Sequence, residues 1–433
     1  MLTIMLNSLF HLLIFFSFII RIPLAFALVI LRPLSRPLQM RIDFERKNLI
    51  DDASQAFWRL KLSADYLFHV SSEGELEQSQ TLIDLYLEAG KRIEIIFTSP
   101  SVEKKCRELY LNYPNQVRIL RLPVASFFPI NFLYFQSLFQ FVTAPVVIMC
   151  RYDFFPELLY LKFFRKKMIL LSAATKKWNQ YKFFAFGFFD LIIAATPEEA
   201  KRIQAMVKVP VVFMEFRFPR IFKRLECTPQ LFASRIEVKE FCQKIIQDPR
   251  EKIVLGSLWP SDLDIFQDPA FLEDIKSNRC LIVIAPHKLN RDYVEQLIEG
   301  LRNYIPRNLI SIVDQNNLSI HAPIVINLLP GMLCELYQFF DCAYVGGGHE
   351  KSIHSVLEPF LMGAKVICGN KVHRSTEYDY ILEIAPKEIV VLNDPKLFYT
   401  KWKELKIDPN KFDRLELQQL MMQSMLKVIE QIG

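Results

Sequence analysis

The chain reads Tyr344-Val-Gly-Gly-Gly-His-Glu-Lys-Ser-Ile-His-Ser-Val-Leu-Glu-Pro359 at its most informative point. The apolar run Cys342 to Val345 predicts a buried strand, and a helix is expected over Ser355 to Gly363. Glycine lets the backbone approach a ligand and adopt positive φ, and the free N–H groups at a helix start favour phosphate. The pattern therefore predicts an anion-binding turn with Glu358 within reach of a ribose; a plain strand-to-helix turn is the alternative. Only 12 of the 433 residues are glycine, so three in a row favour a ligand site.

Length and charge limit the classes of protein to consider. A chain of 433 residues is too long for one ordinary core and fits two domains. It is 51% hydrophobic with 37 Phe, which excludes a disordered chain and indicates a globular or membrane-associated one. The net charge of +6, from 53 basic and 47 acidic residues, is small for a nucleic-acid binder. It suits an anionic membrane surface or anionic substrates, and no nucleic-acid partner is expected.

Metal and cofactor motifs are not favoured by the pattern of side chains. The eight cysteines are scattered without a C-x-x-C pair, which indicates a reducing compartment and no zinc site. The seven histidines are dispersed, and an H-E-x-x-H motif does not occur. Neither a G-x-x-x-x-G-K-[ST] loop nor a G-x-S-x-G elbow is present. We expect no metal and no cofactor.

The first 35 residues have the composition of a membrane anchor. Met1 to Ile20 carries no charged side chain, and Ile22 to Leu31 is again apolar after Arg21. Twenty such residues can span a bilayer core. A cleaved signal peptide, with Ala25-Phe26-Ala27 as its cleavage site, is the alternative. Because the basic residues follow the apolar run, we expect an uncleaved anchor, or a helix dipping into one leaflet of the cytoplasmic membrane, with the body in the cytoplasm.

Beyond residue 51 the pattern alternates between apolar runs and helical periods. Near-continuous apolar strands between helices indicate parallel sheets covered on both faces. We expect a Rossmann-like domain over 45–220, a second one over 250–400 and C-terminal helices over 401–433. The crossing falls near 216–250, and the predicted α/β architecture has two Rossmann-like halves facing a cleft. The expected strands are Tyr66–Val70, Ile93–Thr98, Val117–Leu122, Val146–Cys150, Met168–Ser172, Leu191–Ala195, Val209–Phe213, Ile253–Ser257, Cys280–Ala285, Leu309–Val313, Pro323–Leu328, Cys342–Val345, Lys365–Cys368 and Glu388–Val391.

Polar residues follow three expected strands of the first half, where ligands of such sheets bind. Glu75 lies just after the strand Tyr66–Val70, where its carboxylate can act as a general base. The alternative is a helix-capping box formed by Ser72 and Glu75. Asp153 follows another strand, with an Arg–Asp surface pair as its alternative. Arg217 follows the last strand, where a guanidinium suits phosphate or carboxylate; a solvated basic patch is its alternative.

Three loops of the second half also follow expected strands. They are Gly256-Ser257-Leu258-Trp259-Pro260, Ala285-Pro286-His287-Lys288 and Pro330-Gly331-Met332-Leu333. The last precedes a helix whose backbone could read the edge of a nucleobase. Each loop is a weak signal alone, but with Gly346 to Pro359 they form one set of strand-end loops.

Together these stretches resemble the Kdo (3-deoxy-D-manno-octulosonic acid) transferase family, GT-B glycosyltransferases of lipopolysaccharide synthesis. The resemblance runs over nearly the whole chain. It implies a GT-B fold in which the domain over 45–220 binds the acceptor and the domain over 250–400 binds the CMP-sugar. The family's glycine run followed by G-x-H-N-x-L-E-P/A corresponds to Gly346-Gly347-Gly348 and Ile353 to Pro359, and its H-x-x-S-x-G-E-F/x-E-Q to His69 to Gln78. Its A-G-S-T-W-P-x-D, A-P-H and G-M-L-x-x-L-Y motifs correspond to Gly256 to Asp262, Ala285 to His287 and Gly331 to Tyr337.

The resemblance implies an inverting, metal-independent transfer of Kdo from CMP-Kdo to a lipid A precursor (lipid IVA) at the membrane. Glu75 would accept the proton of the acceptor hydroxyl, while Asp153 and Arg217 match family positions thought to steady the transition state. The residues implied to hold CMP-Kdo are Ser257, Pro286, His287, Pro330, Gly331, Met332, Gly347, Ser355, Val356, Leu357 and Glu358.

The chain departs from the family pattern at several positions. Asp153 stands for the usual Glu, Leu258 for Thr, Ser355 for Asn and Pro219 for Asp, and Met214 stands where Gly is common. A related GT-B enzyme that uses another nucleotide sugar, and a non-catalytic membrane-associated scaffold, therefore remain as alternatives.

Overall fold

The computed structural model describes residues 32–49, 62–110, 112–122, 138–151, 153–175, 180–407 and 412–433, and scattered positions between 8 and 31. The chain divides into two compact units, Met1–Arg217 with Ser424–Gly433, and Phe218–Gln423. Within the described residues, no helix is long and apolar enough to cross a membrane. The segment 1–35, expected to be an anchor, lies largely outside the described residues.

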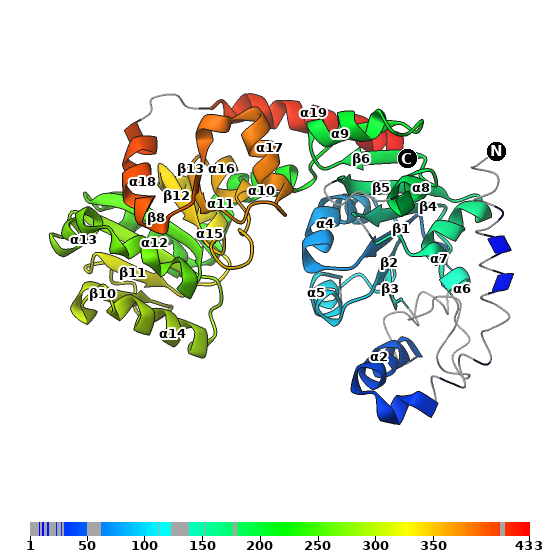
Figure 1. The fold of residues 1–433 in the computed structure, drawn as a ribbon, viewed down its shortest axis with the longest axis horizontal. Helices are drawn as coiled ribbons and strands as arrows, with labels where there is room; N and C mark the ends of the chain where they lie inside the picture. The colour runs from blue at the N-terminus through cyan, green and yellow to red at the C-terminus, as the bar shows by residue number, and fades with distance from the viewer. Residues whose placement is uncertain are drawn as a thin grey trace. The chain divides into compact units, whose positions relative to one another are not determined.

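The first unit is built on a parallel seven-stranded sheet in the order β3-β2-β1-β4-β5-β6-β7 (Figure 1). Every strand expected from its apolar run is present, with ends that differ by at most two residues. The strands are β1 (Tyr66–Val70), β2 (Ile93–Phe97), β3 (Val117–Arg121), β4 (Val146–Cys150), β5 (Lys167–Ala173), β6 (Leu191–Ala194) and β7 (Val211–Phe213). The helices are α2 (Arg36–Arg46), α4 (Glu73–Glu88), α5 (Pro100–Tyr110), α6 (Leu138–Phe141), α7 (Pro156–Tyr160), α8 (Gln180–Phe186) and α9 (Pro197–Gln204).

Both faces of this sheet are buried, which explains why its strands have continuous apolar sequences. Successive side chains of a strand point to opposite faces. Leu67 of β1 accordingly packs in one hydrophobic cluster, and its neighbour Phe68 packs in another. The second cluster also contains Met425, Val428 and Ile432 of α19 (Arg414–Ile432), so the end of the chain belongs to the core of the first unit.

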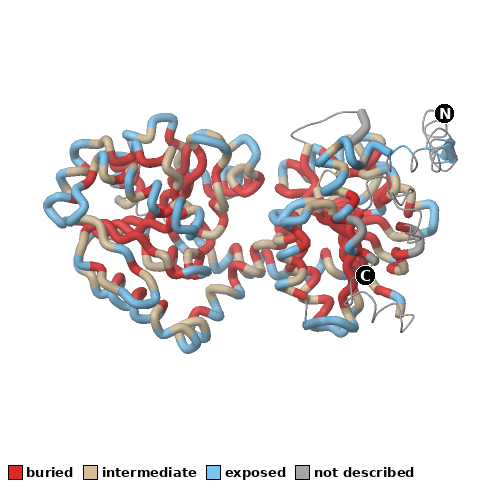
Figure 2. The backbone as a smooth tube through the Cα atoms, turned by 90° about the horizontal axis from the view of Figure 1, so that it is seen from below, coloured by how far each residue is buried: buried red, intermediate tan, exposed pale blue. Residues whose placement is uncertain are grey.

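The second unit repeats the plan with the strand order β10-β11-β9-β8-β12-β13-β14. Its strands are β8 (Glu251–Leu258), β9 (Cys280–Pro286), β10 (Ile310–Val313), β11 (Ile324–Asn327), β12 (Cys342–Val345), β13 (Lys365–Gly369) and β14 (Ile389–Leu392). Its helices include α10 (Arg217–Glu226), α11 (Thr228–Ser234), α12 (Ile236–Gln247), α13 (Pro269–Lys276), α14 (Arg291–Arg302), α15 (Leu333–Leu336), α16 (Leu357–Leu361), α17 (Thr376–Ile384) and α18 (Phe398–Ile407). Figure 2 shows buried backbone running through the middle of each unit.

One expected helix is shorter than predicted. The helix expected over Ser355 to Gly363 is α16, which covers only Leu357–Leu361. Residues before it close a turn on the glycines, because Lys351 N donates to Gly347 O and His354 N donates to Gly346 O. The helix ends at Leu361, and Gly363, just beyond its C-cap residue Met362, has a φ of +106°, a conformation that favours glycine.

Candidate active site

Glu75 lies at the start of α4, just beyond the carboxyl end of β1. Ser72 is the N-cap residue, and its Oγ accepts the backbone N–H of Glu75 at 3.3 Å. The Glu75 carboxylate accepts the N–H of Ser71 at 2.7 Å, one residue before the N–H that a capping box uses. The helix-capping alternative therefore holds for Ser72, while the Glu75 carboxylate turns toward the strand end.

The environment of the Glu75 carboxylate favours its protonated form. Its side chain is buried, and burial is the main reason why its pKa rises from 4.5 to about 7. The negative charge of Asp153 raises this pKa further, whereas Arg151 and the Ser71 N–H oppose the rise. A carboxyl group with a pKa near neutrality is suited to general acid–base chemistry.

Asp153 reaches the same region because β1 and β4 are neighbours in the sheet. Arg151, the first residue after β4, adopts a positive φ of 62° and directs its Nε to Gln78 Oε1 at 3.0 Å. Gln78 lies on α4, so Arg151 ties the end of β4 to the helix that carries Glu75. The structure thus brings together Glu75 and Asp153, two of the three predicted catalytic residues.

His69 was noted only as part of a motif, but it is a central residue of this region. Its ring is fully buried beside Phe155, at 5.5 Å between ring centroids. Burial lowers its pKa to about 4 although Asp153 acts in the opposite direction, so the imidazole is neutral at pH 7.

In the described part of the chain, neither ring nitrogen of His69 has a hydrogen-bond partner. Three more buried polar atoms have no partner among the described residues: Ser71 Oγ, Gln78 Nε2 and Gln80 Oε1. Buried polar groups normally have partners, so this cluster is equipped to bind a polar ligand.

The third predicted catalytic residue, Arg217, is held by an ion pair. Its Nε lies 2.8 Å from Glu215 Oε1, and its terminal nitrogen lies 2.7 Å from Glu215 Oε2. Burial alone would raise the pKa of Glu215, but Arg217 lowers it, so the carboxylate is charged. Sequence analysis missed Glu215; the Glu-x-Arg spacing after β7 was the available signal. Thr81 of α4 donates to the carbonyl oxygen of Phe216 and joins this loop to the helix of Glu75.

In the second unit, Asp262 connects two of the predicted strand-end loops. Its carboxylate is fully buried and accepts the N–H groups of Trp259 and Gly347, each at 2.9 Å. It also accepts the hydroxyl of Tyr344 at 2.9 Å. Burial raises its pKa, while these donors act to lower it. Asp262 was part of a motif but had no role assigned from sequence.

Three aromatic rings from separate loops stack beside Asp262. The rings of Trp259 and His287 lie 4.6 Å apart, and those of His287 and His354 lie 4.2 Å apart. Trp259 Nε1 donates to His354 Nε2 at 2.8 Å. Burial lowers the pKa of His287 to about 4, and the charges of neighbouring side chains act in the same direction. His287 is also joined to the β8 loop because its N–H donates to Leu258 O at 3.1 Å.

The three glycines are required by backbone packing, whether or not a ligand binds. A Cβ at Gly346 would lie 2.4 Å from Ser257 O, and one at Gly348 would lie 2.7 Å from the Cα of Gly369. Gly347 has a φ of +92°. Ser257 itself has a positive φ of 49° at the irregular end of β8. The close contacts explain the triplet, so it is weaker support for a ligand than the sequence alone indicated.

The segment Ser355 to Glu358 makes contacts that the sequence did not predict. The N–H groups of Val356 and Leu357 donate to Glu377 Oε2 at 2.8 and 3.1 Å. Glu377, which is buried on α17, therefore occupies backbone donors that we expected to bind phosphate. The N–H of Glu358 lies 3.4 Å from Ser355 Oγ.

Glu358 faces a cation of its own unit. Arg224 on α10 lies 3.7 Å from Glu358 and makes two 2.7 Å contacts with Glu335. Its guanidinium therefore lies between two carboxylates, one of them in the position predicted to bind a ribose. Arg224 was not singled out from sequence.

The loop before α15 offers backbone atoms more than side chains. Gly331 is exposed with a φ of +68°, and Pro330 is exposed with its carbonyl oxygen accepting from Arg235 at 2.7 Å. The Met332 side chain is fully buried. Pro286 ends β9. Among the described residues, no cluster of His, Cys, Asp and Glu could hold a metal ion.

Comparisons with known proteins fit this architecture. No protein-family model matches the chain, and a search of curated proteins finds no match. Among solved structures, the UDP-GlcNAc 2-epimerase from Neisseria meningitidis bound to UDP-GlcNAc is similar, with a TM-score of 0.51 and 12% identity over 84% of this chain and 100% of that one. At this identity the likeness establishes the fold, and the two parallel sheets fit a two-domain GT-B Rossmann-like fold.

Two further solved structures are similar at lower scores. A glycosyltransferase from Rickettsia africae has a TM-score of 0.47 and 11% identity over 84% of this chain and 94% of its own. The C-terminal CMP-Kdo-binding domain of WaaA from Acinetobacter baumannii has a TM-score of 0.34 and 16% identity, over 48% of this chain and 98% of that domain.

Proposed function

We propose that this chain is a glycosyltransferase that transfers Kdo from CMP-Kdo to a lipid A precursor, lipid IVA, with inversion and without a metal. The observation that supports it most is the buried Glu75 carboxyl, whose pKa is raised to about 7 among polar groups that lack partners within the described residues. Glu75 accepts the proton of an acceptor hydroxyl as that oxygen bonds to the anomeric carbon of Kdo. The bond from that carbon to the phosphate of CMP breaks, and CMP leaves with the electron pair.

The residues around Glu75 have separate tasks in this mechanism. Burial raises the pKa of Glu75, and the negative charge of Asp153 adds to this rise, so that the base is poised near neutral pH. The ring nitrogens of His69 and the Nε2 of Gln78, which have no partner in the described part of the chain, hold the acceptor sugar. Arg217, kept charged and oriented by Glu215, supplies positive charge for the charge that develops in the transition state.

The donor half of the proposal rests on the strand-end loops of the second unit. Trp259, His287 and His354 place polar ring edges together, and Ser257, Gly331 and Ser355 lie on adjoining loops. CMP leaves as a phosphate monoester, whose charge fixed donors stabilise without reorganisation.

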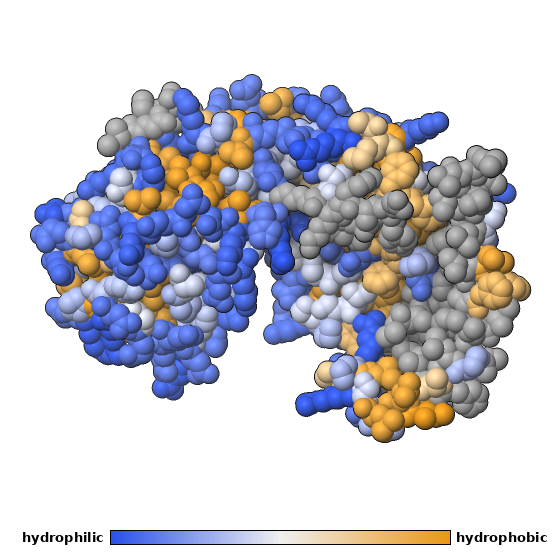
Figure 3. All heavy atoms as spheres, in the orientation of Figure 1, coloured by the Kyte–Doolittle hydropathy of each residue, from blue (hydrophilic) through white to orange (hydrophobic). Residues whose placement is uncertain are grey.

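Membrane association of the N-terminal segment is also part of the proposal. Leu34, just before α2, is 79% exposed, and Met40, on α2, is 59% exposed. Figure 3 shows the apolar patch around α2. Exposed apolar groups near basic residues suit the surface of an anionic bilayer. Attachment there keeps the enzyme at the cytoplasmic face of the membrane that holds its lipid acceptor.

A donor-substitution assay tests the function. The protein is incubated with lipid IVA and either CMP-Kdo or UDP-sugars, and products are identified by mass. We expect Kdo-bearing product from CMP-Kdo, and none after Glu75→Ala although that variant still binds CMP.

Transfer from a UDP-sugar alone would replace this function by the second candidate, a GT-B enzyme with another donor. The N–H groups of Val356 and Leu357, which the resemblance assigns to CMP, donate to Glu377, and this observation weighs against CMP as the donor. A wild-type protein that neither transfers sugar nor binds CMP would indicate a scaffold.

A further inference from the structure

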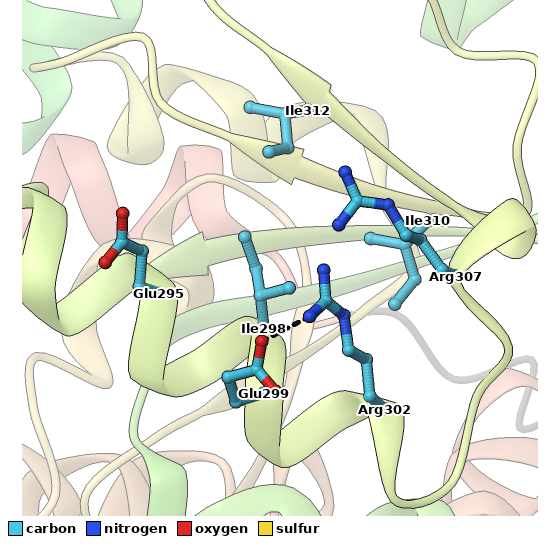
Figure 4. A pocket seen from close by; sticks show the side chains of 7 residues that line it. All are labelled: Glu295, Ile298, Glu299, Arg302, Arg307, Ile310 and Ile312. Atoms are coloured by element: carbon cyan, nitrogen blue, oxygen red, sulfur yellow. Dashed lines mark hydrogen bonds and ion pairs between the residues drawn. The ribbon is translucent and has the colours of Figure 1, made fainter.

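A pocket in the second unit lies away from the loops described above. Helix α14 and strand β10 enclose about 350 Å³, in the range of small-molecule sites. Its walls are the later part of α14 and the segment that begins at Arg307 (Figure 4). The candidate donor site, by contrast, lies at the carboxyl ends of β8, β9 and β12. The lining residues are Glu295, Ile298, Glu299, Arg302, Arg307, Ile310 and Ile312.

The apolar part of the wall comes from two elements facing each other. Ile310 and Ile312 are two residues apart on β10 and therefore point to the same face of the sheet. Ile298 lies on the same side of α14 as Glu295 and Arg302, at helical spacings of three and four residues. Ile312 is 36% exposed, so part of this apolar surface is open to solvent. Because β10 ends the sheet order, no further strand covers it in the described part of the unit.

The charged part of the wall consists of two glutamates and two arginines. Glu299 pairs with Arg302, and Glu295 pairs with Arg291 at 2.7 Å. The described residues give the guanidinium of Arg307 no acidic partner. The Nε of Arg302 is buried and also lacks a hydrogen-bond partner among them. Figure 4 shows both guanidinium groups directed into the same space, next to Ile298.

We propose that this pocket binds a small amphiphilic anion. Its carboxylate or phosphate group contacts the Arg307 guanidinium beside Arg302, and its short apolar part covers Ile298, Ile310 and Ile312. Guanidinium groups bind both kinds of acid with paired hydrogen bonds. No aromatic ring lines the pocket, so it lacks the stacking surface that a nucleobase would use. This site is independent of the proposed transferase activity.

Titration of the full-length protein, labelled at isoleucine δ1 methyl groups, tests the proposal by NMR. The probes are hexanoate, hexyl phosphate, hexan-1-ol and inorganic phosphate. We expect at least one of the two amphiphilic acids to shift the methyl signals of Ile298, Ile310 and Ile312 saturably, and comparison of the two identifies the preferred acid group. We expect hexanol and inorganic phosphate to bind at least about tenfold more weakly, because each lacks one of the two contacts.

Two matched variants locate the acid group. Arg307→Gln should weaken binding of the preferred acid about tenfold or more, and circular dichroism verifies that this surface variant folds. Arg279→Gln changes an arginine whose side chain is 57% exposed elsewhere in the unit, and it should leave binding unchanged. The proposal is overturned if neither acid shifts the three methyl groups, or if hexanol or inorganic phosphate binds as tightly as the acids. Unchanged binding by Arg307→Gln would overturn it as well.

Discussion

The indole nitrogen of Trp259 lies 2.8 Å from Nε2 of His354, and the two residues come from loops 95 positions apart in the chain. An indole N–H can only donate, so His354 Nε2 must accept and carry no proton. Burial lowers the pKa of His354, which keeps its ring neutral. The proton of the neutral ring is therefore on Nδ1, and Trp259 determines which atom of His354 can donate to a ligand.

Replacing Trp259 by Phe should release this constraint. Phenylalanine preserves a ring in the stack with His287 but has no N–H. We expect the ¹⁵N signals of the His354 ring to change from one tautomer to a mixture, and CMP to bind about five- to tenfold more weakly, the value of one hydrogen bond. NMR and calorimetry measure the two effects. Ring signals that stay those of a single tautomer would contradict the assignment.

The pH dependence of transfer should follow the carboxyl of Glu75. A general base acts in its deprotonated form, and the pKa of Glu75 is about 7. We therefore expect kcat/KM to fall about tenfold for each pH unit below 7 and to level off above it. Asp153→Asn removes a negative charge that raises this pKa, so the falling limb should move to lower pH. A falling limb that moves to higher pH in this variant would contradict the prediction that Asp153 raises the pKa of Glu75.

The raised pKa of Glu75 also predicts a gain in stability when the charge is removed. The folded state binds the proton more tightly than the unfolded state, so stability declines as pH rises from 4.5 to about 7. At pH 8.5 the buried charge of Glu75 lowers the free energy of unfolding by about 3 kcal/mol. The Glu75→Gln variant retains an oxygen that accepts from the Ser71 N–H, but its neutral amide does not bury a charge. Denaturant unfolding should show the variant more stable at pH 8.5 by up to about this amount, with a much smaller difference at pH 4.5. Equal differences at both pH values would contradict it.

The glycine turn should tolerate little added volume. A Cβ at Gly348 would lie 2.7 Å from both the Cα of Gly369 and Cγ2 of Ile353. Because Gly369 meets it with backbone atoms, we expect Gly348→Ala to destabilise the second unit by about 1–3 kcal/mol. Gly74→Ala is the matched control, since a Cβ there meets nothing within 4 Å and Gly74 lies in helix α4. Thermal unfolding should show the control unchanged or slightly stabilised.

The strands were predictable because their cause is local. Runs such as Val146–Cys150 are apolar throughout, as expected for a strand whose two faces are both buried. The carboxyl-end positions of Glu75 and Asp153 followed from the strand order along the chain. Their pKa values did not follow, because burial and the approach of Asp153 depend on the neighbouring strands β1 and β4.

The partners of the site residues were not predictable from motifs. Whether Arg217 is free depends on the rotamer of Glu215, and Glu377 reaches the N–H groups of Val356 and Leu357 from another helix. The glycine triplet has the same sequence whether a ligand or the Gly369 backbone lies against it. Such distinctions require contacts between residues that are distant in sequence.

The place of α19 has a consequence for the order of folding during synthesis. Met425, Val428 and Ile432 help to form the core around β1 and β2, although more than 300 residues separate them from these strands. A ribosome synthesises these three side chains after every described strand of both units. The first unit therefore completes its core only once α19 has been made, whereas the strands of the second unit are all synthesised before α19.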